Sequence, residues 1–447
     1  MSATEPVDQA KNYVHFMLLP LKIVGCWEWY PHAVNKQIYV NNIYICMVLF
    51  ILTNLPLSLV VHLYTEWTDV MSNLDKMADG LPLFVSVAIV AYFVIYKKEL
   101  YELIEFMNFN FKWHSANGLT NMTMEGSYKT ARNFAYLYTA CTFFSVAMYV
   151  GLPVIVLFSN PLHPWIYKDV EGGLFIFFVF LRQCVAQGFV ALAMGQLGVF
   201  FACNAILLCG QLDLLCCSLR NVRFTALLQN NVAHEALKLQ GYSILEDEQH
   251  SYMYNISTET ESSHHYDVEV ISHFNLAKLR MLYLIIDIYS KHYDDGTVRA
   301  IVECARVCQV VKEYQGRFEA FVSPLLALRV VQVTLYLCTL LYAATLKFDM
   351  VTLEYLLAVA LDIYVYCYFG NQIILQADRV STAAYQSAWT TMGVAPRRLL
   401  LNMLLANRRP VIMRAGRFLP MNLHTFVLII KTSFSYYTLL VNMNESQ

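Results

Sequence analysis

Charged residues are scarce in this 447-residue chain, where Asp, Glu, Lys and Arg together make up 14% of the sequence. An ordinary soluble protein carries about 25%. Hydrophobic residues make up 57%, and the mean hydropathy is +0.45. Apolar runs of about 20 residues, long enough to cross a bilayer as a helix, recur along the chain. The sequence therefore predicts an all-α, polytopic membrane protein and excludes an ordinary soluble one.

Several chemical signatures are missing as well. The net charge is -2 and no basic cluster stands apart from the loops, which argues against nucleic acid as a partner. The sequence has no nucleophile–base spacing, no phosphate-binding loop and no zinc-type Cys/His spacing, so we expect neither an enzyme nor a metal or other cofactor. The first 35 residues contain no apolar stretch followed by a small-residue cleavage site. We therefore expect the first spanning helix to serve as the targeting signal.

Seven apolar segments are the predicted transmembrane helices: 38–64, 77–96, 134–158, 174–209, 321–346, 351–375 and 422–443. These divide the chain into regions. Residues 1–37 are expected to be cytoplasmic or interfacial, 38–209 to hold the first four spans, 321–375 the fifth and sixth, and 420–443 the seventh. Between them, 210–320 is predicted to be a cytoplasmic helical extension and 376–419 a cytoplasmic anchor helix. The piece 241–269 has seven acids and no Lys or Arg, and is predicted to be a disordered insert.

The distribution of basic residues predicts the orientation of the chain in the membrane. Segments on the N-terminal side of the membrane carry 25 Lys and Arg, and the opposite segments carry only Lys76, Lys168 and Lys347. By the positive-inside rule the N-terminus is cytoplasmic and the C-terminus extracellular, the reverse of a G-protein-coupled receptor. The cysteines fall in spans or on the cytoplasmic side, so no disulfide framework is expected. Cys216 and Cys217, just past a membrane end, are candidates either for burial or for palmitoylation.

Three sequence stretches resemble a known family. They are YFGNQ at 368–372, AYQSAW at 384–389 and TFVLIIKTSFSYY at 425–437. Together with seven inverted spans, they resemble the insect odorant receptors. The related gustatory receptors end in Thr-Tyr followed, five apolar residues later, by Gln-Phe. The nearest equivalent here is Ser435-Tyr436 followed by Asn442-Met443, which favours an odorant receptor. The long cytoplasmic loop and the extreme C-terminus depart from the pattern of the shared co-receptor, so the chain resembles a ligand-tuning subunit.

The resemblance implies a heterotetrameric, ligand-gated, non-selective cation channel formed with odorant co-receptor subunits. It implies localisation to the plasma membrane of sensory neuron dendrites, a small volatile ligand bound in the outer half of the helix bundle, and a pore lined by the last helix. Cations would pass through that pore, and lipids would surround the spans. A membrane carrier or a gustatory-type receptor channel is the alternative; internal repeats would favour a carrier, and the sequence has none.

The last helix is the candidate pore lining. Leu439 and Met443 are four residues apart and share a helical face near its outer end, with Asn442 beside them. By resemblance Leu439 takes the gate position, and Asn442 and Met443 line the outer mouth. The alternative is an ordinary lipid-facing or packed leucine.

The predicted spans contain the basic residues Arg182, Arg329 and Lys431, and Asp362 lies well inside the sixth span. Asp362 and Lys431 lie at similar depths, about 16 to 18 Å from the outer surface by the helical rise. Because charges at this depth are expensive and usually find partners, we hypothesise that Asp362 and Lys431 pair or face neighbouring polar cavities. The alternative is that each meets water or backbone independently. Arg182 is a candidate for the ligand cavity, although snorkelling or pairing with a nearby polar residue is the simpler interpretation.

The ligand cavity is expected to have aromatic and aliphatic walls with few polar anchors. Ser145, Met148, Tyr149 and Leu152 fall on one helical stripe, and Ser145 and Tyr149 would orient a carbonyl or hydroxyl. Plain helix packing is the competing interpretation for each residue. The predicted ligand-binding set is Phe84, Ala88, Ser145, Met148, Tyr149, Leu152, Phe177, Phe178, Leu181, Tyr355 and Val359.

Overall fold

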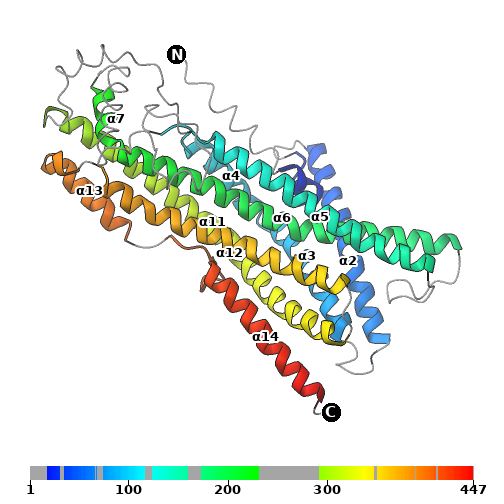
Figure 1. The fold of residues 1–447 in the computed structure, drawn as a ribbon. Coiled ribbons are helices and arrows are strands. Elements are labelled where there is room, and N and C mark those ends of the chain that lie inside the picture. Colours follow the sequence, from blue (N-terminus) through cyan, green and yellow to red (C-terminus); the bar gives the residue numbers. More distant parts are fainter. Residues whose placement is uncertain are drawn as a thin grey trace, which may run out of the picture.

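The computed structural model describes residues 18–30, 35–65, 67, 74–115, 123–159, 173–230, 291–346, 350–387, 389–408 and 411–445. These residues form a bundle of long helices with one short hairpin (Figure 1). The predicted disordered insert at 241–269 lies outside the described residues. The elements are α2 (Asn35–Thr65), α3 (Leu74–Ile95), α4 (Lys97–Asn110), α5 (Glu125–Ser159), α6 (Gly173–Arg220), α7 (Val222–Gln229), η3 (Lys291–Tyr293), α11 (Asp294–Leu346), α12 (Met350–Tyr385), η4 (Trp389–Thr391), α13 (Val394–Ala406), β1 (Arg414–Ala415), β2 (Leu419–Pro420) and α14 (Leu423–Glu445).

The predicted spans correspond to α2, α3, α5, α6, α11, α12 and α14. By length and hydropathy alone, four helices within the described residues pass as membrane spans: 36–65, 181–220, 291–342 and 356–385. A fifth is the pair 80–95 and 97–110, which is bent by 68°. The other two predicted spans correspond to α5 and α14. Four helices extend beyond their apolar segments: α5, α6, α11 and α12. Their polar extensions remain helical because they pack against one another.

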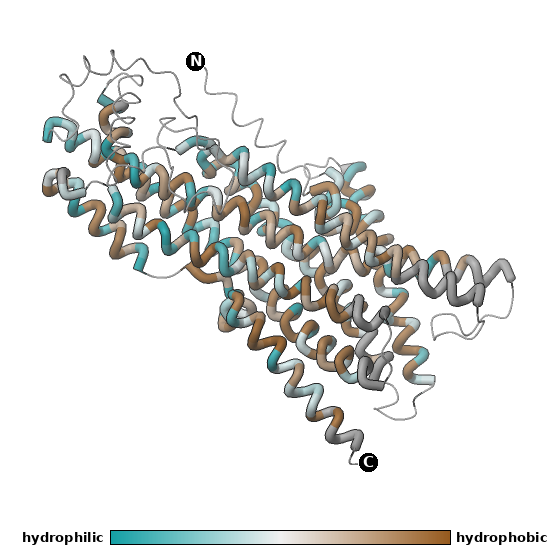
Figure 2. The backbone as a smooth tube through the Cα atoms, in the orientation of Figure 1, coloured by the Kyte–Doolittle hydropathy of each residue, from teal (hydrophilic) through white to brown (hydrophobic). Residues whose placement is uncertain are grey.

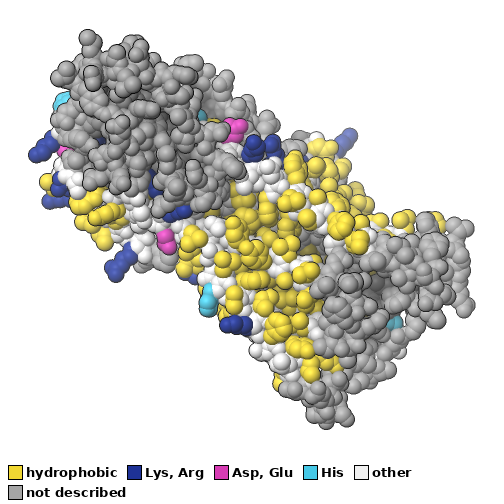
Figure 3. Space-filling model, viewed as in Figure 1, with side chains coloured by type: hydrophobic (Ala, Val, Ile, Leu, Met, Phe, Trp, Pro, Cys, Tyr) yellow, Lys and Arg dark blue, Asp and Glu magenta, His cyan; other side chains and the backbone are white. Residues whose placement is uncertain are grey.

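Exposed apolar side chains mark the surfaces that face lipid. On α2, Ile43, Phe50 and Leu57 repeat every seven residues and are exposed, whereas Val48 and Leu52 are buried. Hydrophobic residues dominate the middle of the bundle (Figure 2). On the face shown in Figure 3, hydrophobic side chains cover the middle of the molecule, and most of the visible Lys and Arg atoms lie toward the end where α13 lies. This distribution fits helices whose central parts are in a bilayer.

The anchor end of the bundle comprises residues 196–230, 291–320 and 376–420. Its core is aromatic: Tyr314 and Phe318 on α11 stack with ring centroids 6.2 Å apart, and Phe201 of α6 stacks on Phe318 at 5.5 Å. The Tyr314 hydroxyl donates to Asn204 Oδ1 at 2.5 Å. Arg223, with its side chain 2% exposed, is held by Asp294 at 3.0 Å. These contacts bury polar groups in pairs, as expected of a packed protein core.

The single anchor helix expected over 376–419 is divided in the structure. Residues up to Tyr385 continue α12, α13 covers Val394–Ala406, and a hairpin of β1 and β2 follows. Both Gly416 and Arg417 have a positive φ, as the tight turn between the two strands requires. The helical part of this segment therefore ends at Ala406, before the hairpin.

The hairpin fixes where α14 begins. The Gly416 amide donates to the Ser323 carbonyl of α11 at 2.9 Å, and Asn422 Oδ1 accepts from the Thr425 amide at 2.9 Å as an N-cap. Gly370 of α12 lies against the same junction. A Cβ added there would be 2.2 Å from the Met421 carbonyl oxygen, so only glycine allows this approach.

Candidate functional site

A cavity of about 260 Å³ lies among α3, α5, α6, α11 and α12. Most of its wall is apolar or weakly polar, with a charged group on one side. The lining residues are Pro82 on α3; Tyr138, Cys141, Thr142, Ser145 and Val146 on α5; Gln187, Val190, Ala191, Met194 and Gly195 on α6; Arg329, Gln332, Val333 and Tyr336 on α11; and Ala358, Val359, Leu361 and Asp362 on α12. The cavity therefore has the composition expected for a small, mostly apolar ligand.

The charged side is a buried ion pair between α11 and α12. The Arg329 guanidinium donates to Asp362 Oδ2, with the two side chains only 5% and 11% exposed. The Tyr138 hydroxyl of α5 donates to Asp362 Oδ1 at 2.9 Å. Both carboxylate oxygens thus have donors, as a charge in a low-dielectric interior requires. The network joins three of the helices that line the cavity.

Arg329 also holds the amide of Gln332, one turn further along α11. An Arg329 Nη1–H donates to Gln332 Oε1, and the same nitrogen lies 3.2 Å from the Met194 sulfur of α6. Gln332 is 4% exposed and lines the cavity. The guanidinium therefore fixes the orientation of a polar group in the cavity wall.

The cavity lies deeper in the bundle than the predicted ligand set. On α5 it is lined by Tyr138 to Val146 rather than by Ser145 to Leu152, and on α6 by Gln187 to Gly195 rather than by Phe177 to Leu181. Measured along α11, it lies about 15 to 26 Å from Leu346 by the helical rise. With Leu346 as the outer end of the fifth span, as the sequence predicts, this depth corresponds to the middle of the membrane.

Of the predicted ligand-binding residues, Ser145 and Val359 line the cavity. Four others, Phe84, Ala88, Phe178 and Leu181, are exposed and do not line it. Met148 is 38% exposed and also lies outside the lining. The side chains of Tyr149, Leu152, Phe177 and Tyr355 lie outside the described residues.

The intramembrane charges are arranged differently from the hypothesis. Asp362 pairs with Arg329, not with Lys431. Lys431 is exposed on α14, on the face away from α11. Arg182 is exposed and does not line the cavity. The sequence placed Asp362 and Lys431 at the same depth, but depth does not give the direction in which a side chain points.

The predicted pore residues lie at the end of α14. Leu439 is 56% exposed within this single chain, and the side chains of Asn442 and Met443 lie outside the described residues. Cys216 and Cys217 are 5% and 0% exposed, which favours their burial over palmitoylation.

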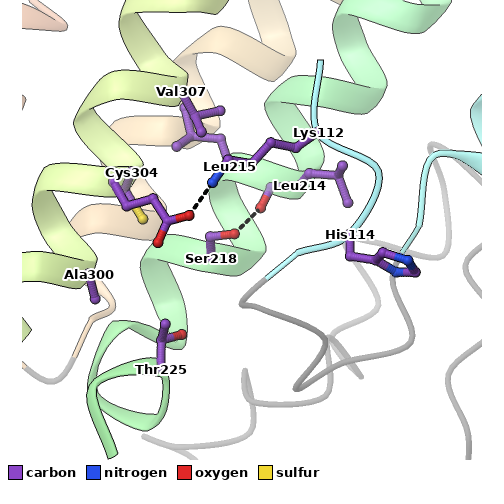
Figure 4. Close-up of a pocket in the computed structure, with 10 residues that line it drawn as sticks. Lys112, His114, Leu214, Leu215, Ser218, Thr225, Ala300, Cys304 and Val307 are labelled. Carbon is purple, nitrogen blue, oxygen red and sulfur yellow. Dashed lines mark hydrogen bonds and ion pairs between the residues drawn. The ribbon is translucent and has the colours of Figure 1, made fainter. Parts of the chain in front are cut away.

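A second, smaller hollow lies at the anchor end (Figure 4). It has a volume of about 30 Å³, enough for a single water molecule. Lys112 pairs with Glu303 beside it, and the Ser218 hydroxyl donates to the Leu214 carbonyl at 2.8 Å. Its size and internal pairing make it part of the packing rather than a ligand site.

The resemblance implies that the fifth span, α11, contributes to the ligand cavity, but the predicted ligand-binding set names no residue of this helix. Arg329, Gln332 and Tyr336 recur every three or four residues and so share one helical face. The signal was present, because Arg329 and Gln332 are polar residues in an otherwise apolar span.

Comparison with known proteins adds independent information. The family model described as "7tm Odorant receptor" matches residues 74–434. The chain is similar to Odorant receptor 83a of Drosophila melanogaster, 26% identical over 351 residues that cover 76% of this chain and 73% of that protein. It is also similar to Putative odorant receptor 85e of the same species, 25% identical over 432 residues that cover 92% and 87%. The solved structure of the insect olfactory receptor OR5 from Machilis hrabei in complex with eugenol matches with a TM-score of 0.68 at 15% identity, over 98% of this chain and 100% of that one. At that identity the structural match establishes the fold alone.

Proposed function

Because this chain belongs to the seven-transmembrane odorant receptor family, we propose that it is the ligand-tuning subunit of a heterotetrameric, odorant-gated, non-selective cation channel. The chain is a multi-pass membrane receptor and not an enzyme. Its partners in the channel are odorant co-receptor subunits, and its proposed location is the plasma membrane of a sensory neuron. The observation that carries the ligand-binding part of this proposal is the cavity between α3, α5, α6, α11 and α12.

The cavity suits a small volatile ligand. Its volume of about 260 Å³ is slightly below that of pockets for drug-sized molecules, which start at about 300 Å³. Val190, Val333 and Leu361 supply apolar wall, while the polar groups are concentrated around Arg329. A receptor of the same fold has been solved with eugenol, which supports a ligand of this size class.

The pore proposal rests on the two faces of α14. One face, with Thr425, Ile429 and Ser433, is buried against the bundle. The opposite face is exposed and carries a polar stripe, His424, Lys431, Ser435 and Thr438, at spacings of seven, four and three residues. Such a stripe on a membrane helix is expensive in lipid and favourable beside water. It therefore supports a helix that faces an aqueous pathway in the assembled channel.

The outer face of α13 supports assembly with other subunits. Val394, Leu401 and Leu405 are exposed at 67%, 56% and 59% and recur every seven and four residues. Pro396, Leu400 and Met403 bury the opposite face inside this chain. A helix with an apolar stripe on its free side fits a subunit interface beneath the membrane better than open solvent. A helix lying along the membrane surface is the competing interpretation.

The proposed opening of the channel depends on a difference in the ligand's affinity for the open and closed states. A ligand that binds the open arrangement of the helices more tightly shifts an existing closed–open equilibrium toward the open state. The network of Tyr138, Arg329 and Asp362 links three helices around the cavity. A ligand there contacts groups whose arrangement sets the relative positions of α5, α11 and α12.

The test is electrical recording from cells that express this chain with and without an odorant co-receptor, during application of volatile compounds. We expect a non-selective cation current that requires both chains. Current from this chain alone would contradict the assignment as a tuning subunit. Absence of current to every compound, with surface expression confirmed, would contradict the channel, and uptake of labelled compounds would then identify a carrier.

A cysteine in the cavity allows the location of the ligand to be tested. Cys141 is exposed and lines the cavity. A small, membrane-permeant methanethiosulfonate applied to the co-expressed channel is expected to reduce the odorant current, and an activating odorant present during the treatment is expected to protect it. The Cys141→Ser variant should be insensitive. Equal modification with and without the odorant would show that the ligand binds elsewhere.

A further inference from the structure

We propose that the Gln332 side-chain amide is the hydrogen-bond donor that selects ligands carrying an acceptor oxygen, such as the carbonyl of a small aldehyde, ketone or ester. This inference rests on the proposed ligand cavity and specifies the chemistry that the cavity recognises. It is carried by the fixed orientation of one buried amide in a wall that is otherwise mostly apolar.

The orientation of the amide follows from its neighbour. A guanidinium has only donors, so the atom of Gln332 that meets Arg329 must be the carbonyl oxygen Oε1. The Nε2 amino group then lies in the same amide plane, on the opposite side of the Cγ–Cδ bond from Oε1. Rotating the amide by half a turn would bring two donors together and is therefore disfavoured. Gln332 thus presents N–H groups, and not an acceptor, to the remaining space beside it.

Arg329 is itself held in place. Asp362 accepts from its guanidinium, and Tyr138 donates to Asp362 at 2.9 Å. The chain of contacts runs from α5 through α12 to α11, so the position of Gln332 is set by three helices. Arg329 and Asp362 are in this sense positioning residues for the amide.

The Gln332 amino group has no protein acceptor among the described residues. Gln332 is 4% exposed, and it lines the cavity. A buried donor left without an acceptor in an apolar environment carries an uncompensated desolvation penalty. A ligand oxygen placed beside it removes that penalty, whereas a hydrocarbon does not.

Two hydroxyl groups of the cavity do not offer an equivalent donor. The hydroxyl protons of Tyr138 and Thr142 are committed, to Asp362 and to the Tyr138 carbonyl, both at 2.9 Å. Gln187 lines the cavity and is half-buried, with no partner that fixes its amide among the described residues. It can present either its oxygen or its amino group, so it does not distinguish a donor ligand from an acceptor ligand.

The test compares pairs of ligands that differ at one atom. 2-Alkanones of five to nine carbons and the corresponding 2-methyl-1-alkenes have nearly the same shape, because a methylene group replaces the carbonyl oxygen. The channel is the full chain co-expressed with an odorant co-receptor, and the readout is the concentration for half-maximal current. We expect wild type to respond to the ketone about five- to tenfold more sensitively than to its alkene, the factor that one hydrogen bond supplies.

Gln332→Met removes the donor and keeps the length of the side chain. We expect it to abolish the preference for the ketone while the response to the alkene stays within twofold, which also shows that the variant folds. Gln332→Leu provides a second, shorter apolar variant. Gln187→Met is expected to change the responses to both members of a pair by the same factor. Gln372→Met, on α12 outside the cavity lining, is the matched control and should resemble wild type.

The possible failures are distinguishable. A wild type equally sensitive to ketone and alkene, or a Gln332→Met variant that keeps the preference, would overturn the role of Gln332 while leaving the receptor function intact. Silence to all carbonyl compounds, alongside a response to another odorant, would overturn the ligand class. Silence to every volatile compound, with both chains at the cell surface, would instead reject the proposed function itself.

Discussion

At the scale of single residues, Arg329 and Asp362 are the least expected feature of this membrane-spanning bundle. They lie inside two helices that pass a hydropathy test for membrane spans, and each is at most 11% exposed at its side chain. Removing one partner of a buried ion pair typically costs about 3 to 5 kcal/mol, because the other charge remains buried without compensation. Replacing both with apolar groups of similar size is often nearly neutral.

This asymmetry gives a prediction. Asp362→Asn and Arg329→Met, each alone, should strongly lower the stability of the folded protein. The double variant Arg329→Met, Asp362→Leu should recover much of the lost stability. Surface expression and the melting temperature of detergent-extracted protein measure the effect. Lys431→Met, which removes an exposed charge, is the control and should melt close to wild type. A double variant as unstable as the worse single variant would show that the pair does not act as a unit.

The buried cysteines of the anchor end should be chemically inert. Burial raises the pKa of the Cys304 thiol to about 12, and the thiolate is the reactive form. At pH 7 to 8 Cys304 should therefore remain protonated and unmodified by N-ethylmaleimide in the folded protein. It should react within minutes once a denaturing detergent is added. Mass spectrometry of peptides from both conditions makes the comparison, and rapid labelling of the folded protein would show that this end opens.

Sequence reasoning reached some of these residues and not others. It identified Asp362 as a charge in need of a partner, and it used helical rise to find its depth. The choice of Lys431 was wrong because α14 turns that side chain away from the bundle, and periodicity within one helix does not say how two helices are rotated relative to each other. Ser145 and Val359 line the cavity, and their role in ligand binding stays a prediction.

At the scale of elements, α14 carries its charge on an exposed polar face. If this face borders the ion pathway, Lys431 repels cations. At about 7 Å in water, one unit charge raises the energy of a monovalent cation by about 0.6 kcal/mol and that of a divalent cation by twice as much. Lys431→Gln should therefore raise the permeability to Ca²⁺ relative to Na⁺ by about two- to threefold, and Lys431→Glu by more.

Reversal potentials in solutions of different Ca²⁺ concentration measure this ratio. Ser435→Ala, on the same face of α14, removes a hydroxyl but no charge and should leave the ratio near that of wild type. An unchanged ratio in both Lys431 variants would show that this face of α14 does not border the pathway.

The junction between α12 and α14 depends on Gly370. An added Cβ would meet the Met421 carbonyl oxygen at 2.2 Å, so Gly370→Ala must displace the start of α14. We expect the variant to lose most of its odorant-evoked current, more than it loses surface expression. Gly316→Ala on α11 is the matched control, because an added Cβ there meets nothing within 4 Å. Normal currents from Gly370→Ala would mean that the junction has room to adjust.

The limits of helices were predictable from the sequence where an apolar segment has clear polar boundaries. The limits of the spans agree with α2, α3 and α14 to within a few residues. The anchor segment was predicted as one helix because its leucines and arginines fit a helical period. The hairpin at 414–420 was missed, since its register depends on Ser323 of α11, which is distant in sequence.

At the scale of the whole molecule, the orientation in the membrane follows from the distribution of basic residues. A tag added at the N-terminus should be accessible to antibody only after the cells are permeabilised, and a tag at the C-terminus should be accessible in intact cells. Immunofluorescence with and without detergent checks both. A soluble cytoplasmic marker confirms that the intact cells are sealed. Staining of the N-terminal tag in intact cells would contradict the predicted orientation.

Fold class and family were accessible from the sequence, because composition and the C-terminal motifs are properties of the chain itself. The position of the cavity was not. It depends on how α5, α6, α11 and α12 are staggered along their axes. The centre of the lining is shifted from the predicted position by about two turns on α5 and about three turns on α6. Hydropathy carries no information on that shift.

The length of α11 has a mechanical consequence. This helix of 53 residues is clamped at Ser323 by the hairpin, next to Pro324, where a backbone hydrogen bond is missing. Gln332 lies about 14 Å beyond that point and Leu346 about 35 Å beyond it, by the helical rise. The helix is therefore a lever with its fulcrum at Ser323–Pro324 and α14 alongside its long arm. If α11 pivots at this point as a straight rod, a displacement of about 1 Å at Gln332 corresponds to about 2.5 Å at Leu346, the ratio of the two distances.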